Sequence, residues 1–311
     1  MGNFIDSDRV TISRKSIENV LGNIGNDDDP NNYARRAYGA IFDAVLGPAA
    51  RQPKHFNVPE ILPESFDLRT SVAKPYPVIH DQRKLSACTA FAATAALEFT
   101  SRRQRLFPVW SLSPIYLYYV LSSTVAGNSG AAVPGQINKS LKDEGSSLED
   151  AMTALERGIA PLKDWPLDRP WNMTPDVLAQ DKSRAYKATK GSCVAVEQVL
   201  DQLHTVLANG FSIAFSFVVS EEGDAWMRSE TKQHESNFLY PANWGEQDFP
   251  KVKYAHSVLL IGYNGLARHF IVRNSWGPDW GTEDGHFFIS YETVTEPFWC
   301  RDFFTVLEVD Q

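Results

Sequence analysis

The sequence predicts an α+β protein in which a helical half precedes a strand half. Apolar residues recur at helical spacing, with cap and glycine signals at the ends of the segments, as far as Asn209 and Gly210. Beyond that point the apolar pattern has a period of 2, as in strands. A cysteine at the start of a helix falls in the first half, and a histidine and an asparagine fall in the second. We therefore expect two lobes with a functional cleft between them.

Five helices are expected, over residues 33–46, 86–103, 114 onward, 148–157 and 197–208. The first has apolar residues at helical spacing and should dock on another element. The second carries Phe91, Ala95 and Phe99 on one stripe and ends in two arginines, which suit the negative end of the helix dipole. The third has Ser113 as N-cap and Pro114 at the first helical position.

Five strands are expected in the second half, over residues 212–219, 255–263, 269–273, 285–291 and 303–308. Residues 220–252 are expected to form a long, tryptophan-containing insertion between the first two of these strands. No internal repeat is apparent, so the halves are not copies of one unit.

Cys88 is the first candidate for chemistry, because it lies where a polar loop enters a helix of small and apolar residues. The unsatisfied N–H groups and positive dipole end of a helix N-terminus stabilise a thiolate, which is the reactive form of cysteine. Gln82, six residues earlier, carries an amide that can donate to an oxyanion beside the sulfur. By itself, this stretch fits a small buried core cysteine equally well.

Two later segments favour the catalytic interpretation. One has His256 at the start of a predicted strand, and the other reads Asn-Ser-Trp-Gly from Asn274. Cysteine, histidine and asparagine then follow in that order along the chain. His80, His269 and His286 lack such a motif, and we expect them to be hydrogen-bonded structural residues.

Together these segments resemble the active-site segments of the papain-like cysteine proteases. In that family the order is Gln, Cys, His, Asn, with the glutamine six residues before the cysteine, as for Gln82, Cys88, His256 and Asn274 here. The match around Asn274 is specific, whereas around Cys88 only two positions of the family pattern C-G-[SA]-C-[WY] agree. The resemblance implies a papain-like two-lobed fold, with a helical left lobe, an antiparallel β-barrel-like right lobe and the active site in the cleft between them.

Three residues near the cysteine depart from the family pattern. Leu85 replaces a cysteine that normally joins a disulfide, Ser86 replaces a glycine near the substrate backbone, and Thr89 replaces an aromatic residue beside the oxyanion hole. The cleft shape and the rate are therefore expected to differ from those of the family, although the reacting groups are all present.

The resemblance implies a cysteine endopeptidase and a role for each group. Cys88 attacks the peptide carbonyl and forms an acyl-enzyme, while His256 takes and returns the proton, so that the resting pair is a thiolate and an imidazolium. Gln82 and the backbone N–H of Cys88 stabilise the oxyanion. Asn274 orients the imidazole, and Trp276 shields their hydrogen bond from water.

Substrate-binding residues are expected on both sides of this pair. Gly145 is similar to a family glycine that lets a substrate strand bond closely to its backbone, although a plain turn glycine is the alternative. A residue of 300–302 should join the pocket walls, and an inward Arg301 or Asp302 would make the cleft selective for charge. The remaining wall residues are expected to be Ser146, Ser147, Leu148, Ala255, Ser257 and Trp276.

Composition limits the partners. The chain has 311 residues and a net charge of −8, which argues against nucleic acid or an anionic membrane as a partner. No apolar run is long enough to span a bilayer. Neither His-Glu-x-x-His nor paired Cys-x-x-Cys occurs, so no metal or other cofactor is expected. We expect a monomer that acts on a protein or peptide substrate.

The cysteines and the N-terminal residues indicate the compartment. If Cys88 is the nucleophile, only Cys193 and Cys300 are left to pair, and we expect both to be reduced. The first residues have neither the basic nor the apolar region of a secretory signal. The protein is therefore expected in the cytoplasm, or exported without a classical signal peptide.

Three regions are expected along the chain. Residues 63–180 should form the helical lobe with the cysteine, and residues 181–311 the strand-rich lobe with the histidine. The stretch Pro-Glu-Ser-Phe-Asp-Leu-Arg from Pro63 resembles the start of the mature family enzymes. Residues 1–62 are therefore an extension, either an arm with no part in catalysis or a pro-segment lying over the cleft as a lid, as in a zymogen.

Two other functions stay open at this point. A papain-fold acyltransferase or isopeptidase would use the same triad. A catalytically impaired peptide-binding module is conceivable because of Ser86 and Thr89. The complete Gln, Cys, His, Asn set argues against the binding module, since a relative without activity usually loses the nucleophile.

Overall fold

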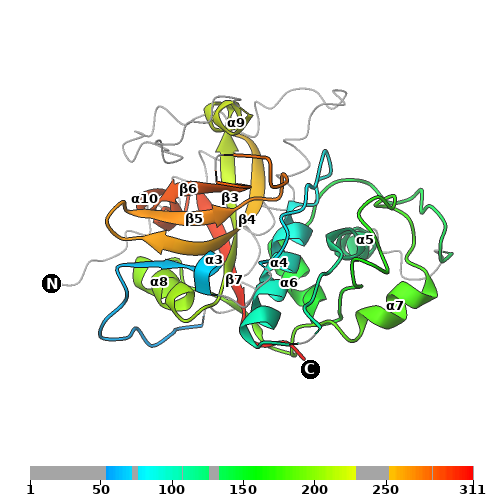
Figure 1. Cartoon of the computed structure of the whole chain (residues 1–311). Coiled ribbons are helices and arrows are strands. Elements are labelled where there is room, and N and C mark those ends of the chain that lie inside the picture. The colour runs from blue at the N-terminus through cyan, green and yellow to red at the C-terminus, as the bar shows by residue number, and fades with distance from the viewer. Residues whose placement is uncertain are drawn as a thin grey trace.

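A computed structural model describes residues 54–71, 76–106, 108–125, 133–228, 252–281 and 283–310. Within them, a group of helices lies beside a single sheet of seven strands (Figure 1). The α+β fold class and the division into a helical side and a strand side, both expected from the sequence, are confirmed.

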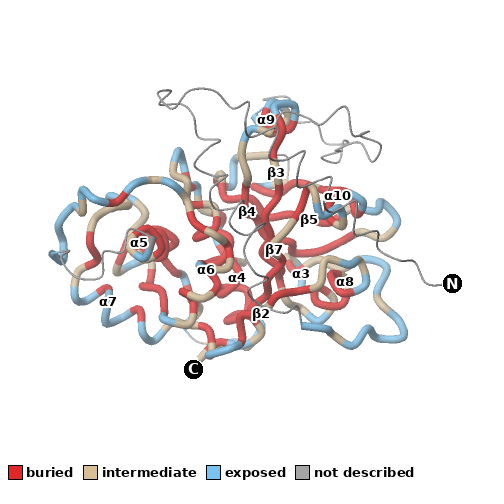
Figure 2. The backbone as a smooth tube through the Cα atoms, turned by 180° about the vertical axis from the view of Figure 1, so that it is seen from behind, coloured by how far each residue is buried: buried red, intermediate tan, exposed pale blue. Residues whose placement is uncertain are grey.

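The helical side consists of α4 (Cys88–Arg103), α5 (Pro114–Val125), α6 (Leu148–Leu155) and α7 (Val177–Ser183). α4 is its central element, because it packs on α5, α6 and strand β4. Its sequence contains five alanines, which favour a helix and leave room for close neighbours. Most of α4 is therefore buried, and it runs through the interior of the molecule (Figure 2).

The sheet is antiparallel and has the order β2-β7-β3-β4-β5-β6, with β1 also paired to β4. The strands are β1 (Ser65–Asp67), β2 (Cys193–Ala195), β3 (Ile213–Ser220), β4 (Val252–Asn264), β5 (His269–Arg273), β6 (His286–Ser290) and β7 (Cys300–Val306). β4 is the longest strand and lies in the middle of the sheet. It carries His256, which lies opposite Phe217 of β3.

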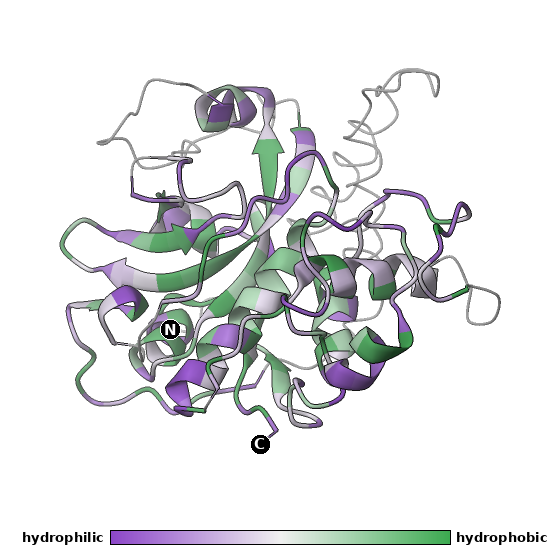
Figure 3. Ribbon diagram, turned by 45° about the vertical axis from the view of Figure 1, so that its right-hand side comes forward, coloured by the Kyte–Doolittle hydropathy of each residue, from purple (hydrophilic) through white to green (hydrophobic). Residues whose placement is uncertain are grey.

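Four further helices accompany the strands: α3 (Leu68–Ser71), α8 (Leu200–Ala208), α9 (Glu221–Arg228) and α10 (Tyr291–Thr295). α8 packs on β3 and β4, and α10 packs on β6 and β7. α9 stands at the end of β3 and is largely hydrophilic, whereas hydrophobic residues run through the strands (Figure 3).

Most expected elements are present, with ends shifted by a few residues. α4, α5, α6 and α8 correspond to four of the expected helices, and the expected helix over 33–46 lies outside the described residues. The last strand begins at Cys300, three residues earlier than expected. From the sequence we did not expect β1, α3, α7, β2, α9 and α10, because elements of three to eight residues carry little periodic signal.

Each end of the described chain packs on the side opposite to the one expected from its position in the sequence: the N-terminal end on the strand side and the C-terminal end on the helical side. β1 belongs to the sheet, and the hydroxyl of Tyr263 on β4 donates to the carbonyl of Pro63 at 2.8 Å. At the other end, Val309 is buried in the hydrophobic cluster of the helical side. The side chain of Gln104, just after α4, accepts from the N–H of Val309 at 2.7 Å and donates to its carbonyl at 3.2 Å. Each side thus includes a segment from beyond the expected boundary at residue 180.

The described part of the extension, residues 54–62, lies against the strand side. Lys54 N donates to the carbonyl of Ala195 at 2.9 Å. Phe56 N donates to Oε1 of Gln202 on α8 at 2.7 Å, and the carbonyl of Phe56 accepts from Nε2 at 2.9 Å. The prediction that residues 1–62 cover the cleft concerns mainly residues 1–53, which lie outside the described residues.

None of the three cysteines forms a disulfide bond. Cys193 on β2 is paired with Val306 of β7, six residues along that strand from Cys300. Six strand residues span roughly 20 Å, whereas a disulfide needs Cα atoms within about 7 Å. The arrangement of the strands therefore keeps Cys193 and Cys300 from bridging, as the sequence analysis expected.

Candidate active site

Cys88 is the first residue of α4 and opens onto a cleft between the helical and strand sides. The cleft has a cavity volume of about 410 Å³. Ala87 caps the helix without any side-chain hydrogen bond, so the positive end of α4 is left to the residues at its start. The Cys88 side chain is half-buried. The structure thus places this sulfur where the sequence predicted it, at a helix N-terminus facing a cavity.

His256 and Asn274 are brought together on the opposite wall. The Nε2–H of His256 donates to Oδ1 of Asn274 at 2.8 Å, and both side chains are 3% exposed. The Trp276 ring lies beside the imidazole, with ring centroids 5.3 Å apart. This bond fixes the imidazole tautomer and leaves Nδ1 as a proton acceptor. Cys88 and His256 line the same cleft.

Gln82 is held between the two walls. Its Nε2 donates to the carbonyl of Leu85 at 2.8 Å, and its Oε1 accepts from the hydroxyl of Ser275 at 2.5 Å. Its backbone N–H donates to the carbonyl of Ser275 at 2.8 Å. The amide orientation is therefore fixed, and its second N–H is left to serve the cleft that Gln82 lines.

Arg273, which the sequence analysis did not single out, joins the segment of Gln82 to the segment of Asn274. Its guanidinium donates to the carbonyls of Pro77 and Val78 at 2.7 and 2.6 Å. The side chain is 5% exposed. A planar fork of donors suits two successive carbonyls, so Arg273 ties the segment before Gln82 to the strand that leads into Asn274.

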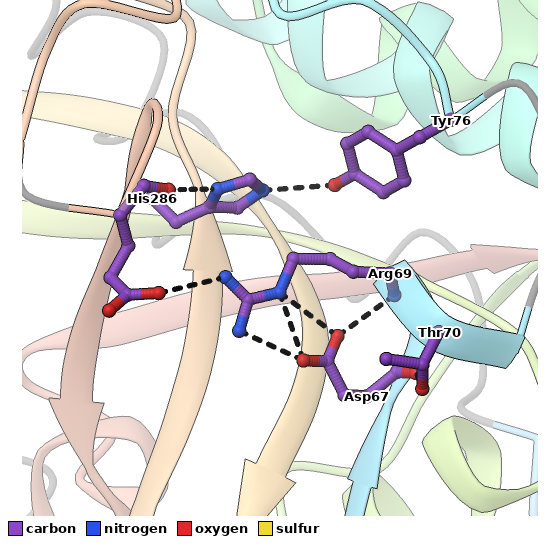
Figure 4. A network of polar contacts seen from close by, with 6 residues as sticks. Asp67, Arg69, Thr70, Tyr76 and His286 are labelled. Carbon is purple, nitrogen blue, oxygen red and sulfur yellow. Dashed lines mark hydrogen bonds and ion pairs between the residues drawn. The ribbon is translucent and has the colours of Figure 1, made fainter.

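A polar network supports the loop behind Asn274 (Figure 4). His286 donates from Nδ1 to the carbonyl of Glu283 at 2.6 Å and accepts at Nε2 from the hydroxyl of Tyr76 at 2.9 Å. Arg69 pairs with Asp67 at 2.8 Å and with the Glu283 carboxylate at 3.2 Å. His286 is thus a structural residue, as expected from the sequence.

Burial favours the neutral form of both members of the catalytic pair. It raises the pKa of the Cys88 thiol, and hydrogen bonds with Ser257 oppose this shift. Burial lowers the pKa of His256 to about 4, and the nearby charge of Arg228 lowers it further. The hydrogen bond with Asn274 opposes this shift. Both directions favour a neutral thiol and a neutral imidazole. The resting thiolate and imidazolium expected from the sequence stay a prediction.

All the predicted substrate-binding residues lie in the walls of this cleft. One wall is formed by the glycine loop and the start of α6, and the other by β4 and the loop after β5. They are Gly145, Ser146, Ser147, Leu148, Ala255, Ser257 and Trp276. Gly145 has φ +79°, a conformation that itself favours glycine. A Cβ there would lie 3.5 Å from the carbonyl of Ser86, so the space alone does not demand glycine.

The loop before α6 is joined to the start of α4 by hydrogen bonds. The N–H of Ser86 and the hydroxyl of the buried Tyr118 both donate to Oδ1 of Asp143, the first at 2.9 Å. The hydroxyls of Thr89 and Ser146 are 2.6 Å apart. Ser86 and Thr89, which depart from the family pattern, therefore both bind this loop. We call this set of contacts the loop clamp.

Several cleft residues were missed by the sequence analysis: Arg83, Lys84, Ser216, Arg228 and Tyr254. Ser216 on β3 lies opposite Ser257, and their hydroxyls are 2.9 Å apart. The alternation of β3 and β4 could have suggested this pair. Arg228 ends α9, inside the segment expected to be an insertion, so no pattern pointed to it.

The described residues show no arrangement typical of a metal or membrane protein. Among them, no three or more His, Cys, Asp or Glu side chains are placed to hold a metal ion. In the same part of the chain, every helix is too short or too polar to cross a membrane.

Comparisons with known proteins agree with this geometry. The family model for papain family cysteine proteases matches residues 170–296, which include His256 and Asn274 but not Cys88. The chain is 28% identical to an uncharacterized peptidase C1-like protein of Acanthamoeba polyphaga mimivirus, covering 81% of this chain and 76% of that protein. It is 25% identical to a cathepsin B-like protein, CP2, of Giardia intestinalis, covering 73% of this chain and 68% of that one.

Solved structures extend the likeness to the helical side. Xylellain, a cysteine protease from Xylella fastidiosa, superposes with a TM-score of 0.65 at 25% identity, covering 83% of this chain and 92% of that one. The cysteine protease and lectin-like domains of Cwp84 from Clostridium difficile share the fold, with a TM-score of 0.53 at 16% identity, covering 90% of this chain and 60% of that one. With these likenesses and the cleft that joins the two halves, the chain resembles the papain family of cysteine proteases, and the comparisons support a peptide hydrolase.

Proposed function

We propose that the protein is a cysteine endopeptidase that cleaves peptide bonds through an acyl-enzyme on Cys88. The observation that carries this proposal is the hydrogen bond from His256 Nε2 to Asn274 Oδ1. It leaves the Nδ1 lone pair of His256 for the cleft onto which the thiol opens. A nucleophile, a base and an orienting group then occupy one cleft, as nucleophilic catalysis requires.

In the first half of the reaction, the sulfur of Cys88 bonds to the peptide carbonyl carbon while His256 Nδ1 takes the thiol proton. This proton transfer gives a thiolate and an imidazolium. The second N–H of Gln82 and the backbone N–H of Cys88 donate to the oxyanion. The imidazolium gives its proton to the amine as the C–N bond breaks, which leaves a thioester.

In the second half, His256 removes a proton from water as the water oxygen attacks the thioester. The C–S bond breaks, the carboxylic acid leaves and the proton returns to Cys88. One water is consumed for each peptide bond. Asn274 contacts no substrate atom in this scheme and acts by orienting the imidazole.

The test combines turnover with chemical labelling. Wild-type protein should hydrolyse peptides and react with an epoxide inhibitor of cysteine proteases at Cys88. Cys88→Ala should abolish both, and His256→Ala should block labelling. Cys193→Ala is the matched control, because it removes a buried thiol on β2 outside the cleft. Thermal unfolding of each variant separates loss of chemistry from loss of fold.

The alternatives give different results in the same assays. A peptide-binding module would bind peptide without hydrolysing it, and wild-type Cys88 would resist the epoxide. An acyltransferase would pass the acyl group to an added amine in preference to water. Residual hydrolysis near the wild-type level in Cys88→Ala would overturn the assignment of the nucleophile.

A further inference from the structure

Two serine hydroxyls face each other in the wall of the cleft beside Cys88. Ser216 of β3 is paired with Ser257 of β4, and their Oγ atoms are 2.9 Å apart. Both residues line the cleft, yet they are only 4% and 3% exposed. Hydroxyls buried to this extent need hydrogen-bond partners, and here each is a partner of the other.

Ser257 also contacts the nucleophile. Its hydroxyl and its backbone N–H both hydrogen-bond to the sulfur of Cys88, and both bonds lower the pKa of the thiol against the larger effect of burial. The sulfur is thus the third member of a row that runs from Ser216 through Ser257 to Cys88. β3, β4 and the start of α4 each supply one member of this row.

The directions of the hydrogen bonds in the row follow from the number of protons. A serine hydroxyl has one proton to donate and two lone pairs that accept. When Ser257 donates to the sulfur it cannot also donate to Ser216, so the proton between the two hydroxyls comes from Ser216. Both hydroxyl protons then point toward the sulfur. Because successive hydrogen bonds polarise one another, Ser216 makes the Ser257 hydroxyl a stronger donor.

We infer that Ser216 and Ser257 form a hydroxyl relay that stabilises negative charge on the sulfur of Cys88. The charge arises when the thiol gives its proton to His256, and again when the C–S bond of the thioester breaks. Ser257 is a further catalytic residue, because it touches the reacting sulfur. Ser216 touches no reacting atom and is a positioning residue that acts through Ser257. The inference rests on the proposed function, because it concerns the same nucleophile.

The test measures the alkylation of Cys88 by iodoacetamide at pH 8, which does not depend on peptide hydrolysis. Ser257→Ala removes the hydroxyl donor to the sulfur. Loss of a hydrogen bond to a charged group should lower the fraction of thiolate by about 10-fold to 100-fold. The remaining thiolate is a better nucleophile, because nucleophilicity rises with the pKa of the thiol. The alkylation rate should therefore fall by about threefold to tenfold.

Ser216→Ala distinguishes a relay from a single donor. It should slow alkylation of the otherwise wild-type protein by about twofold. In the Ser257→Ala background it should have no further effect, because Ser216 acts through the hydroxyl that is missing there. Ser216→Thr keeps a hydroxyl and suits a strand, so this variant should keep the wild-type rate.

Ser212→Ala is the matched control. Ser212 lies just before β3, is 2% exposed and does not line the cleft. Its hydroxyl has no hydrogen-bond partner among the described residues. The variant therefore removes a buried serine hydroxyl that is not part of the relay, and alkylation of Cys88 should keep the wild-type rate.

The serine variants leave the ionisable groups around the sulfur unchanged. Those that line the cleft with Cys88 are Arg83, Lys84, Arg228, Tyr254, His256 and Asp302. Tyr118 of α5 also interacts with the charge of Cys88. Thermal unfolding of each variant shows that it is folded, so a changed alkylation rate reports changed hydrogen bonds of the sulfur.

The outcomes separate the relay from the proposed function. An unchanged or faster alkylation in Ser257→Ala would overturn the inference, because the hydroxyl would then not donate to the sulfur, and hydrolysis by the wild type would stand. Equal slowing by Ser216→Ala in both backgrounds would also overturn it, since Ser216 would then act without Ser257. A wild-type protein that hydrolyses no peptide would overturn the proposed function, while the alkylation rates still decide on the relay.

Discussion

At the residue scale, the buried surroundings of Cys88 and His256 decide the charge of the pair. Burial raises the pKa of Cys88 and lowers that of His256, so burial favours the neutral form of each group. Ser257, adjacent to His256 in β4, hydrogen-bonds to the sulfur and partly offsets the effect of burial.

The first prediction concerns the alkylation of Cys88 by iodoacetamide. Because the thiol pKa is raised, the rate should keep increasing with pH into the range above 9, instead of reaching a plateau near neutrality. The rate is measured by mass spectrometry at Cys88, with Cys193 as the internal control. A plateau between pH 5 and 8 would show a thiolate and imidazolium pair at rest.

At the element scale, the loop clamp joins the start of α4 to the loop that carries Gly145. In the family, the residue at position 85 normally joins a disulfide, whereas here the next residue, Ser86, binds Asp143 through its N–H. The clamp therefore holds the nucleophile relative to the expected substrate-binding loop without a covalent bond.

The second prediction is that Asp143→Ala loosens this loop. The N–H of Ser86 and the hydroxyl of Tyr118 would lose their acceptor, which should cost about 1–3 kcal/mol of unfolding free energy and raise KM more than it lowers kcat. Urea unfolding and steady-state kinetics on one peptide measure both. Glu144→Ala, at an exposed position of the same loop, is the control, and equal behaviour of the two variants would contradict a role for the clamp.

The third prediction separates two parts of the extension. If residues 1–53 cover the cleft, deleting them should raise kcat/KM on a short peptide, because a competitor no longer has to be displaced. Deleting residues 54–62 as well should lower the melting temperature, since the bonds of Phe56 to Gln202 are lost. Rates are compared per titrated active site, and equal constants for full-length and shortened protein would remove the lid proposal.

At the scale of the whole molecule, buried histidines make stability depend on pH. Burial lowers the pKa of four of them to about 4: His80, His204, His256 and His286. In the unfolded chain these groups take up protons below about pH 6.5, while in the folded protein they stay neutral until about pH 4. Their contribution to stability is therefore present above pH 6.5 and lost as the pH falls toward 4.

The fourth prediction follows from His204, which stacks on Tyr263 with ring centroids 4.0 Å apart and lies outside the cleft. His204→Phe should keep activity. Between pH 7 and pH 5, its melting temperature should fall by less than that of the wild type. Its Nε2 has no hydrogen-bond partner among the described residues, so phenylalanine sacrifices little there. Parallel melting curves for the two proteins would contradict this account.

Much of the molecule could be predicted from the sequence, for reasons that differ between residues. Gln82, Cys88, His256 and Asn274 lie in motifs whose spacing does not depend on the rest of the fold. Asp302, which lines the cleft, could be named only as one of two charged candidates, because an irregular register between β3 and β7 overrides the alternation that a strand pattern assumes. Single donors such as Arg273 and single acceptors such as Asp143 leave no periodic signal, since their importance comes from partners distant in the chain.

The two ends of the described chain bear on how the cleft can move. β1 ties the segment before the helical side to the sheet, and Gln104 ties residue Val309 to the end of α4. Widening the cleft would strain both attachments at once, so they oppose a rigid-body rotation of one side relative to the other. We therefore expect the cleft to keep its width when a peptide binds. Selection among peptides then depends on the residues that line the cleft rather than on closure of the cleft around the substrate.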